Sequence, residues 1–297
     1  MSSSRPRVLN VNDREIPRYV NEEILRSQQF DVVSVATGED ALARVEDDIR
    51  RQLEGEGAPP LTVHRSSMDR PNLALAVVPA PGMAHKLAYL AQLVPRLPRP
   101  GLLYCATRER SELVAEYLQL HGVDAAAYHA GLEPEHKRAL QDDFLRGRYT
   151  AIAATNALGM GIDKSDLRYV VHVDLPGSIT AYYQEVGRAG RDGHDAHALM
   201  LIAPGDMPLR RRLIERGSED SPPQPAVVEH KWNLFLELMR WAEGGSCRHD
   251  AILRYFGDEG EALGGCGRCD VCQDLARGTG PDPDNVTLIV RKALSAV

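Results

Sequence analysis

The stretch "GLLYCATRERSELVAEYLQLHG", residues 101–122, contains a strand pattern followed directly by a helix pattern. Its first part, "GLLYCAT", is a short apolar run of the kind that is buried on both faces of a parallel sheet. The second part opens with Ser111, a suitable helix N-cap, and ends at Gly122, a suitable helix terminator. A buried strand that leads into an amphipathic helix is the unit from which parallel α/β sheets are built.

The same alternation extends over residues 72–204. We expect further strands in "DAAAYHA" (124–130), "TAIAAT" (150–155), "LRYVVHVDLP" (167–176) and "AHALMLIAP" (196–204). We expect helices in an apolar stripe that stops at Pro95, in "EPEHKRALQDDFLRG" (133–147) and in "SITAYYQEVG" (178–187). The sequence therefore predicts one complete α/β domain, whose parallel sheet is covered by helices on both faces.

The segments on either side of this domain have different patterns. Residues 7–45 show strand, helix, strand and helix in turn, which is only the beginning of a small α/β domain. From Glu46 the chain is charged and is then broken by glycine and proline. After Pro204 the strand patterns stop, and helical patterns follow in "VVEHKWNLFLELMRWAE" (227–243) and "CRHDAILRYFG" (247–257), before a Pro/Gly linker and a last helix within 278–297.

The composition is that of an ordinary globular protein, since the 297-residue chain is 43% apolar and 26% charged. No apolar run approaches the roughly 18 residues of a membrane-spanning helix. The N-terminus "MSSSRPRVLNVNDREIP" lacks the apolar core of a signal peptide, so we expect a cytoplasmic protein. A net charge of −7 argues against a protein that coats nucleic acid nonspecifically, but it allows a local basic groove.

Four of the five cysteines lie close together near the C-terminal end. In a chain without a secretion signal, this clustering favours a metal over disulfides. Two successive C-x-x-C spacings place Cys266, Cys269 and Cys272 on one turn, and Cys247 supplies a fourth thiolate, which completes the ligand set of a closed, structural zinc site. A reduced cluster of buried thiols and a redox pair are the alternatives. Cys105 lies inside an apolar strand and is expected to be a small core residue.

Three loops that follow expected strands are candidates for a binding site, because the carboxyl ends of parallel strands share the edge at which such sheets bind ligands. They are "YCATR" (104–108), "YHAGL" (128–132) and "ATNALGMGIDK" (154–164). Glycines on both sides of Met160 allow backbone amides to approach a sugar-phosphate chain, and Asp163 is placed to contact a ribose hydroxyl. For each loop alone, ordinary turn chemistry is the alternative, with Arg108 and His129 as solvated strand-end residues.

The stretch "QEVGRAGRDG", residues 184–193, presents two arginines among three glycines directly after an expected helix. Arginine offers a rigid fork of donors that suits phosphate. None of the 25 glycines, however, is followed by lysine, so the chain has no phosphate-binding loop of the G-x-x-x-x-G-K-[ST] type. The sequence thus provides arginines that suit a phosphate but lacks the glycine-rich loop that normally binds one.

In these motifs and their order the chain resembles the second RecA-like lobe of the RecQ family of DNA helicases. "YCATR" is similar to that family's motif IV, "ATNALGMGIDK" to its motif V, and "YYQEVGRAGRDG" (182–193) to its motif VI. The arrangement "CRH…YFGDE…CGRCDVC" resembles the family's zinc-binding subdomain. The resemblance runs from about Glu46 to about Asp274, and it implies a P-loop NTPase-type α/β lobe followed by a small helical zinc-binding subdomain.

The resemblance also implies roles for individual residues. The second lobe supplies arginines across a cleft to ATP that the first lobe holds, so Arg191 would be the arginine finger, Arg188 its neighbour on the γ-phosphate side, and Gln184 a coupling residue on the same helix face. Further nucleotide contacts would come from Gly161 and Asp163. The implied contacts with single-stranded DNA are made by Arg108, His129, Thr155, Asn156 and Met160, and the implied structural zinc ligands are Cys247, Cys266, Cys269 and Cys272.

The departures from the family pattern lead to further expectations. No G-x-x-x-x-G-K-[ST] loop and no D-E-x-H-like motif is present, and "DEGE" at 258–261 does not qualify as the latter. We therefore expect a helicase C-terminal half that is inactive alone and uses ATP and Mg²⁺ only when a first lobe is supplied. A non-enzymatic DNA-binding or regulatory module is the alternative. The family further implies work in DNA repair and recombination on single strands and duplex junctions, as a monomer associated with the nucleoid.

The expected division of the chain has five parts. A fragment that resembles the start of a response-regulator receiver domain comes first, with Asn12 and Asp13 where receivers carry metal-binding acids. We do not expect this fragment to be phosphorylated, since the strand that carries the phosphoacceptor is missing. The parts are 1–45 for this fragment, 46–71 for a remnant of the first lobe and a linker, 72–212 for the second lobe, 213–276 for the zinc-binding subdomain, and 277–297 for a linker and the start of a winged helix.

Overall fold

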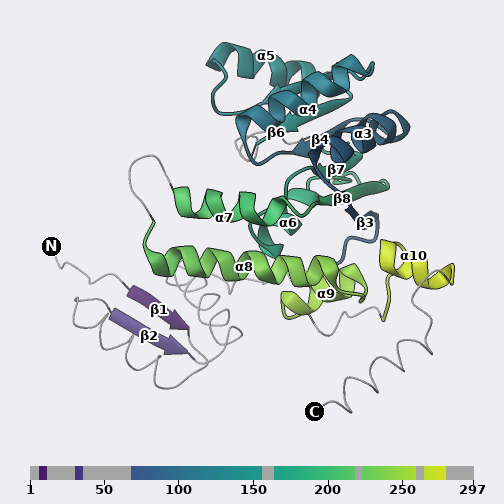
Figure 1. Cartoon of the computed structure of the whole chain (residues 1–297). Coiled ribbons are helices and arrows are strands. Elements are labelled where there is room, and N and C mark those ends of the chain that lie inside the picture. The colour runs from purple at the N-terminus through teal and green to yellow at the C-terminus, as the bar shows by residue number, and fades with distance from the viewer. Residues whose placement is uncertain are drawn as a thin grey trace, which may run out of the picture. The chain divides into compact units, whose positions relative to one another are not determined.

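The computed structural model describes residues 68–155, 164–217, 223–258 and 264–278, together with the backbone of two short strands near the N-terminus (Figure 1). These strands, β1 (Arg7–Val11) and β2 (Asp31–Val35), lie where the sequence predicted them and pair in parallel. They belong to one compact unit, Met1–Ser67, and the rest of the chain forms a second unit, Met68–Val297. The helices expected near the N-terminus and the expected winged-helix segment lie outside the described residues.

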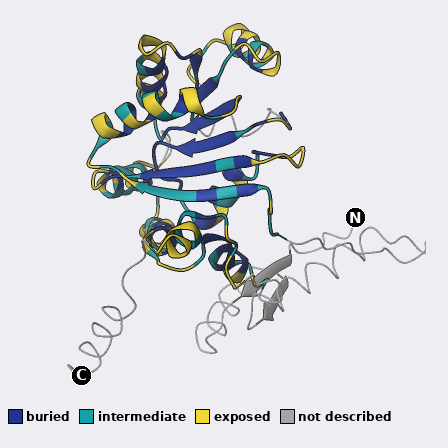
Figure 2. Ribbon diagram, turned by 90° about the vertical axis from the view of Figure 1, so that its right-hand side faces the viewer, coloured by how far each residue is buried: buried dark blue, intermediate teal, exposed yellow. Residues whose placement is uncertain are grey.

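The second unit is built on a six-stranded parallel sheet, which confirms the predicted fold class. All four residues are buried in each of the strands β4 (Gly101–Tyr104), β6 (Ala151–Ala154) and β7 (Tyr169–His172), as expected for strands covered on both faces (Figure 2). Across the sheet, the strands are ordered β3 (Leu73–Pro79), β8 (Ala196–Ile202), β7 (Tyr169–His172), β4 (Gly101–Tyr104), β6 (Ala151–Ala154) and β5 (Ala125–Tyr128).

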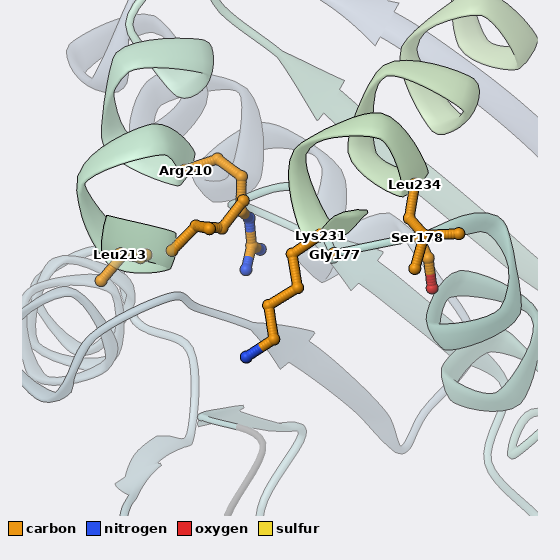
Figure 3. Close-up of a pocket in the computed structure, with 7 residues that line it drawn as sticks. Gly177, Ser178, Arg210, Leu213, Lys231 and Leu234 are labelled. Carbon is orange, nitrogen blue, oxygen red and sulfur yellow. The ribbon is translucent and has the colours of Figure 1, made fainter. Parts of the chain in front are cut away.

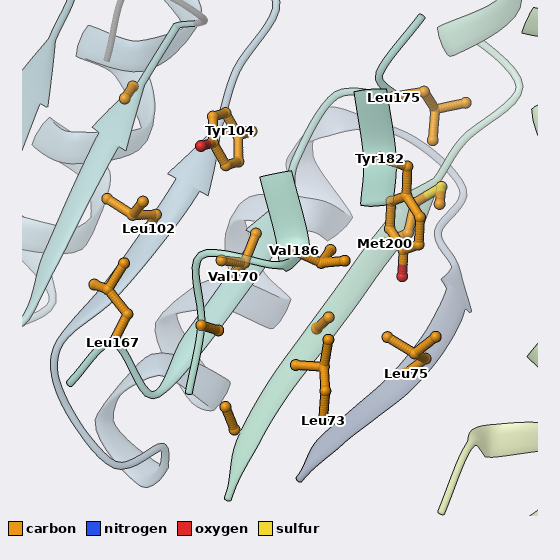
Figure 4. Packing of buried hydrophobic residues seen from close by; sticks show 14 of the residues in the cluster. Leu73, Leu75, Leu102, Tyr104, Leu167, Val170, Leu175, Tyr182, Val186 and Met200 are labelled. Carbon is orange, nitrogen blue, oxygen red and sulfur yellow. The ribbon is translucent and has the colours of Figure 1, made fainter. Parts of the chain in front are cut away.

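Two separate hydrophobic clusters lie on the two faces of this sheet, because successive side chains of a strand point to opposite sides. Leu103 and Cys105 belong to the cluster beneath α3 (Met83–Leu93) and α4 (Arg108–Leu120). Leu102 and Tyr104 belong to the cluster beneath α5 (Pro134–Leu145) and α6 (Ile179–Val186), part of which is shown in Figure 4. Cys105 is buried in the core, as expected, and its burial raises the pKa of its thiol well above the ordinary value.

Helix α4 begins four residues earlier than the sequence suggested. Its N-cap is Thr107, whose hydroxyl accepts a hydrogen bond from the Arg110 amide at 3.3 Å, so Ser111 as the cap was wrong. The Ser111 hydroxyl instead donates to the Arg108 carbonyl at 2.7 Å inside the first turn. The helix ends at Leu120, and Gly122, the expected terminator, follows the C-cap residue His121 with a φ of +78°.

The zinc-binding region is helical and packs on the edge strand β3. It comprises α8 (Pro225–Glu243), α9 (Arg248–Tyr255) and α10 (Asp270–Ala276), and α7 (Asp206–Arg216) packs against α8. The outer edge of β3 pairs with no further strand among the described residues, and α10 uses one of its backbone groups, since the Val77 amide donates to Asp270 at 2.9 Å. Within the described residues, no helix combines the length and apolarity that crossing a membrane requires.

Candidate functional site

The four clustered cysteines converge at one point of the subdomain. All four Sγ atoms lie within 4.8 Å of one another, and the Sγ atoms of Cys266 and Cys272 are 4.0 Å apart. Four sulfurs placed tetrahedrally at about 2.3 Å from a zinc ion would be about 3.8 Å apart, so the cluster fits this metal. All five cysteines are free, which removes disulfides as an explanation of the cluster.

Backbone amides point at these sulfurs. The Cys266 amide donates to Cys247 Sγ at 3.3 Å, the Cys269 amide to Cys266 Sγ at 3.3 Å, and the Cys272 amide to Cys269 Sγ at 3.5 Å. Between the cysteines, Gly267 has a φ of +69°, a conformation that glycine adopts without strain. Burial raises the pKa of Cys247 to about 11, and a bound divalent cation would reverse this preference by favouring the thiolate.

The turn 266–272, which carries three of the cysteines, forms the cysteine knuckle together with Cys247. The residues that follow Cys247 hold this knuckle in place. The Arg248 guanidinium donates to the carbonyls of Trp241, Ala242 and Gly244 at 2.7–3.0 Å and to Asp270 at 3.0 and 3.2 Å. Asp250 accepts the Gly265 amide at 2.8 Å. Sequence reasoning assigned no role to these side chains, although "CRHD" places three polar residues at the start of an amphipathic helix, where a hydrophobic pattern alone does not explain them.

The loops after β4 and β5 and Thr155, which directly follows β6, meet at the carboxyl edge of the sheet, as the sequence predicted. A Cβ atom added to Gly131 would lie 3.0 Å from Arg108 Nη1 and 3.2 Å from His129 Nδ1, so these two side chains converge. Arg108 is exposed, but His129 is buried, and its interpretation as a solvated residue was wrong. His129 Nε2 lies 3.0 Å from a Glu112 carboxylate oxygen. Asn156, Met160, Gly161 and Asp163 lie outside the described residues.

A polar hollow of about 310 Å³ opens at this edge. Ala106, Ala130 and Thr155 contribute one wall, each from a different loop. Another part of the wall is formed by buried and half-buried polar groups of β7, the turn after it and α6: His172, Asp174 and Glu185. His172 Nε2 lies 2.6 Å from Glu185 Oε2. Asp174 accepts the Ala106 amide at 2.8 Å and pairs with Arg110, so the loop after β4 is fixed at this wall.

The arginine loop, residues 187–194, follows α6 and carries both predicted arginines. Gln184 is exposed on the last turn of the helix, Arg188 is half-buried, and Arg191 is exposed. Arg188 lies beside Tyr104, whose pKa is raised to about 12, mainly because the hydroxyl is buried, although the Arg188 charge acts in the opposite direction. The structure therefore presents one guanidinium against the core and the other toward solvent.

Gly190 stands between the two arginines, and only glycine fits there. Its φ is +62°, in the left-handed region. An added Cβ would also lie 2.5 Å from Asn72 Nδ2 and 2.8 Å from the His194 carbonyl oxygen. The Gly190 amide donates to the Leu167 carbonyl at 2.8 Å, which ties the loop to the segment before β7. The glycines of this motif thus serve a tight backbone approach rather than flexibility.

The arginine loop is held from a distant part of the chain, which sequence reasoning missed. The Arg70 guanidinium donates to the carbonyls of Gly187, Ala189 and Gly190 at 3.1, 2.8 and 3.1 Å. Asn72 Nδ2 donates to the carbonyls of Gly190 and His194 at 2.8 and 2.7 Å. The stretch "MDRPN", residues 68–72, therefore functions as a fixed support for the second lobe.

A second hollow, of about 320 Å³, lies between α7, α8 and the turn that precedes α6 (Figure 3). Arg210 and Lys231 extend into it from the two helices, and Gly177 and Ser178 line the side of the turn. The Arg210 guanidinium donates to the Leu175 carbonyl, and burial lowers its pKa. This arginine therefore has a structural task, since it holds the turn from which α6 begins.

Comparison with known proteins agrees with this arrangement. Residues 85–193, which include the loops of the sheet edge and most of the arginine loop, match the helicase conserved C-terminal domain. Together with the fold, this match defines the second lobe of a helicase motor. Residues 204–273, which include all four clustered cysteines, match the RecQ zinc-binding family. The chain therefore carries the C-terminal portion of a RecQ-family helicase.

Individual relatives support the same conclusion. The chain is 35% identical to the ATP-dependent DNA helicase RecQ of Haemophilus influenzae over 87% of this chain and 40% of that protein. It is 38% identical to RecQ of Pasteurella multocida over 71% of this chain and 32% of that protein. It is 42% identical to the probable ATP-dependent DNA helicase RecS of Bacillus subtilis over 67% of this chain and 39% of that protein. The chain thus spans about a third to two fifths of these relatives.

Among solved structures, Dbp5 of S. cerevisiae bound to RNA and ADP BeF3 matches with a TM-score of 0.47 at 20% identity, over 85% of this chain and 57% of that one.

Proposed function

We propose that this chain supplies the second motor lobe and the zinc-binding subdomain of an ATP-dependent DNA helicase, which moves 3′ to 5′ on DNA in recombination and repair. The main support for the proposal is the geometry of the arginine loop, whose backbone is fixed and whose Arg191 side chain is exposed. Gly190, Arg70 and Asn72 fix its backbone, while Arg191 remains exposed. A rigidly presented arginine suits a phosphate that is held by another part of the motor, because little ordering is then needed when the two parts meet.

In this motor the two arginines have different tasks. Arg191 would contact the transferring phosphoryl group of ATP and offset the charge that develops there. Arg188, which is half-buried beside Tyr104, would act on the γ-phosphate side, with Gln184 as a coupling residue on the preceding helix. Gly161 and Asp163 would complete the nucleotide contacts. ATP and Mg²⁺ would be held by a first lobe, which supplies the phosphate-binding loop.

Single-stranded DNA would lie along the carboxyl edge of the sheet. Arg108 and His129 converge on Gly131, and Thr155 lines the adjoining hollow. An exposed arginine and the backbone of glycine-containing loops are suitable contacts for phosphates, which fix position without reading sequence. We propose that Asn156 and Met160 extend this surface. For such contacts, we expect the affinity for DNA to depend strongly on the salt concentration.

The cysteine knuckle would hold one structural zinc ion through Cys247, Cys266, Cys269 and Cys272. With four thiolate ligands the coordination shell is complete, and a bound ion contributes folding energy rather than chemistry. The support for this assignment is the convergence of all four sulfurs within 4.8 Å and the three backbone amides that donate to them.

The remaining expectations complete the proposal. We propose that the protein acts as a monomer in the cytoplasm, associated with the nucleoid, and that single strands and duplex junctions are its DNA partners. The five-part division of the chain, with a receiver-like fragment in 1–45 and the start of a winged helix in 277–297, belongs to the same proposal.

The test is ATP hydrolysis with and without a first lobe. The 297-residue chain by itself should hydrolyse no ATP above background, and fusion of a RecQ-type first lobe ahead of residue 46 should produce DNA-stimulated hydrolysis. Hydrolysis by the chain alone would overturn the assignment of roles. DNA binding without hydrolysis in both proteins would favour a non-enzymatic DNA-binding module.

A further inference from the structure

The segment 68–72, which precedes β3, contacts two distant parts of the chain. One is the cysteine knuckle near the C-terminus, and the other is the arginine loop. The two contacts are made by neighbouring residues, Asp69 and Arg70, whose side chains serve different partners. No motif in the sequence joins segment 68–72 to either region, and each region lies more than a hundred residues from that segment.

Asp69 makes the contact with the knuckle. Its carboxylate pairs with the guanidinium of Arg268, which stands between Cys266 and Cys269 in the sequence. The same carboxylate lies 3.4 Å from His249 Nδ1, and His249 Nε2 is 3.0 Å from the Leu73 carbonyl oxygen. The Asp69 and Arg268 side chains are about four fifths buried, so solvent screens this pair less than an exposed one.

Arg70 makes the contact with the arginine loop. Its three hydrogen bonds end on the carbonyls of Gly187, Ala189 and Gly190, which flank Arg188 on both sides. Such bonds from a charged donor are stronger than bonds between neutral groups. The Tyr183 hydroxyl donates to the Met68 carbonyl, so the last turn of α6 is tied to the same segment.

The backbone that directly follows the two contact residues is constrained. Pro71 follows Arg70 directly, and a residue before proline is restricted to extended conformations. Proline also fixes its own φ. Because Asp69 and Arg70 are adjacent and Arg70 is itself restricted by the following proline, a displacement of Asp69 is expected to displace Arg70 as well.

We propose that Asp69 and Arg70 couple the cysteine knuckle to the arginine loop, so that an intact knuckle is required to hold the backbone that presents Arg188 and Arg191. Arg70 is a positioning residue in this proposal, because it contacts carbonyls of the loop and no reacting group. The coupling concerns the folded chain itself, and only its consequence for ATP hydrolysis depends on the proposed function. Zinc binding at the cysteine knuckle thereby increases the order of the arginine loop, which lies in the α/β lobe.

Hydrogen exchange tests the coupling in the purified 297-residue chain, without nucleotide or a first lobe. Exchange is measured by mass spectrometry on peptides that cover residues 187–194, in zinc-loaded and chelator-treated protein. Zinc removal from the wild type should raise the exchange rate of these amides by on the order of tenfold, as expected when charge-assisted hydrogen bonds to the loop are lost. In Asp69→Ala the rate should already be raised, and zinc removal should add little.

Two variants make the outcome specific. Arg268→Gln breaks the same ion pair from the knuckle without removing a cysteine, and its effect on loop exchange in zinc-loaded protein should not add to that of Asp69→Ala. Asp143→Ala is the control, because it removes another partly buried carboxylate, which lies on α5 and pairs with Arg148 at 3.0 Å. This substitution should leave the response of the loop to zinc unchanged.

The result that would overturn the coupling is a loop whose exchange stays the same on zinc removal while residues 247–272 lose protection. An equal response to zinc in Asp69→Ala and in the wild type would also overturn it. Because neither measurement involves ATP, a failure here is distinct from a failure of the proposed function.

Discussion

Substitution of Gly190 by alanine tests whether the geometry of the arginine loop is as constrained as the structure indicates. Alanine at a φ of +62° costs about 1 kcal/mol in backbone strain. The added Cβ, 2.5 Å from Asn72 Nδ2, must also displace the Asn72 amide, which donates to Gly190 and His194. Loss of two hydrogen bonds at about 1 kcal/mol each brings the expected destabilisation to roughly 3 kcal/mol.

Gly193 provides the matched control. It has a φ of +84°, but no atom lies within 4 Å of an added Cβ, so Gly193→Ala should cost only the backbone strain of about 1 kcal/mol. The assay is urea unfolding of zinc-loaded protein, followed by circular dichroism, with the midpoint and slope determined for both variants. Equal losses of stability in the two variants would refute the argument that Asn72 is packed against this glycine.

Three further outcomes are expected. Cys266→Ser should abolish stoichiometric zinc binding, measured by elemental analysis, and should unfold the region around α9 and α10 while the parallel sheet remains folded. Lys86→Met should destabilise the lobe by about 3–5 kcal/mol in urea unfolding, because it leaves the buried Asp206 carboxylate without its cation; retention of wild-type stability would contradict this. The hydrogen bond from Arg168 lowers the pKa of Asp192, so the ionised carboxylate stabilises the folded state at pH values above its unfolded pKa. This stabilisation is lost as the pH falls below about 4. The free energy of unfolding, measured between about pH 5 and pH 3, should therefore fall less steeply in Asp192→Asn than in the wild type.

The sheet and the cysteine cluster could be predicted because their signals are local. The strands β4, β6 and β7 are continuous apolar runs, and the spacing of three cysteines on one turn is visible directly in the sequence. Strand β3 was not anticipated, since its outer edge is covered by α10, almost two hundred residues further along the chain. Helix α7 was also missed, because its arginine-rich sequence contains Pro208 and few apolar residues.

The site was predictable only in part, for a related reason. The motif around Arg188 and Arg191 indicated phosphate chemistry, but the residues that fix its backbone are Arg70 and Asn72, and a pairing over such a distance leaves no periodic trace. The alternative of a solvated His129 was wrong because the burial of this side chain depends on how α4 packs beside the loop rather than on the loop's own residues. Local patterns indicate which groups are present, and tertiary packing determines how they are oriented.

The central claim, that this lobe acts on a nucleotide held elsewhere, is tested most directly by Arg191 in the protein completed with a RecQ-type first lobe. The measurement is the DNA-stimulated turnover number of Arg191→Ala against the unsubstituted protein, with the exposed Arg146→Ala as a control for loss of a surface charge. We expect turnover to fall by about 10³-fold or more while nucleotide affinity falls much less and the fold is retained, because the guanidinium acts mainly on the transition state. Full turnover in Arg191→Ala would contradict the account.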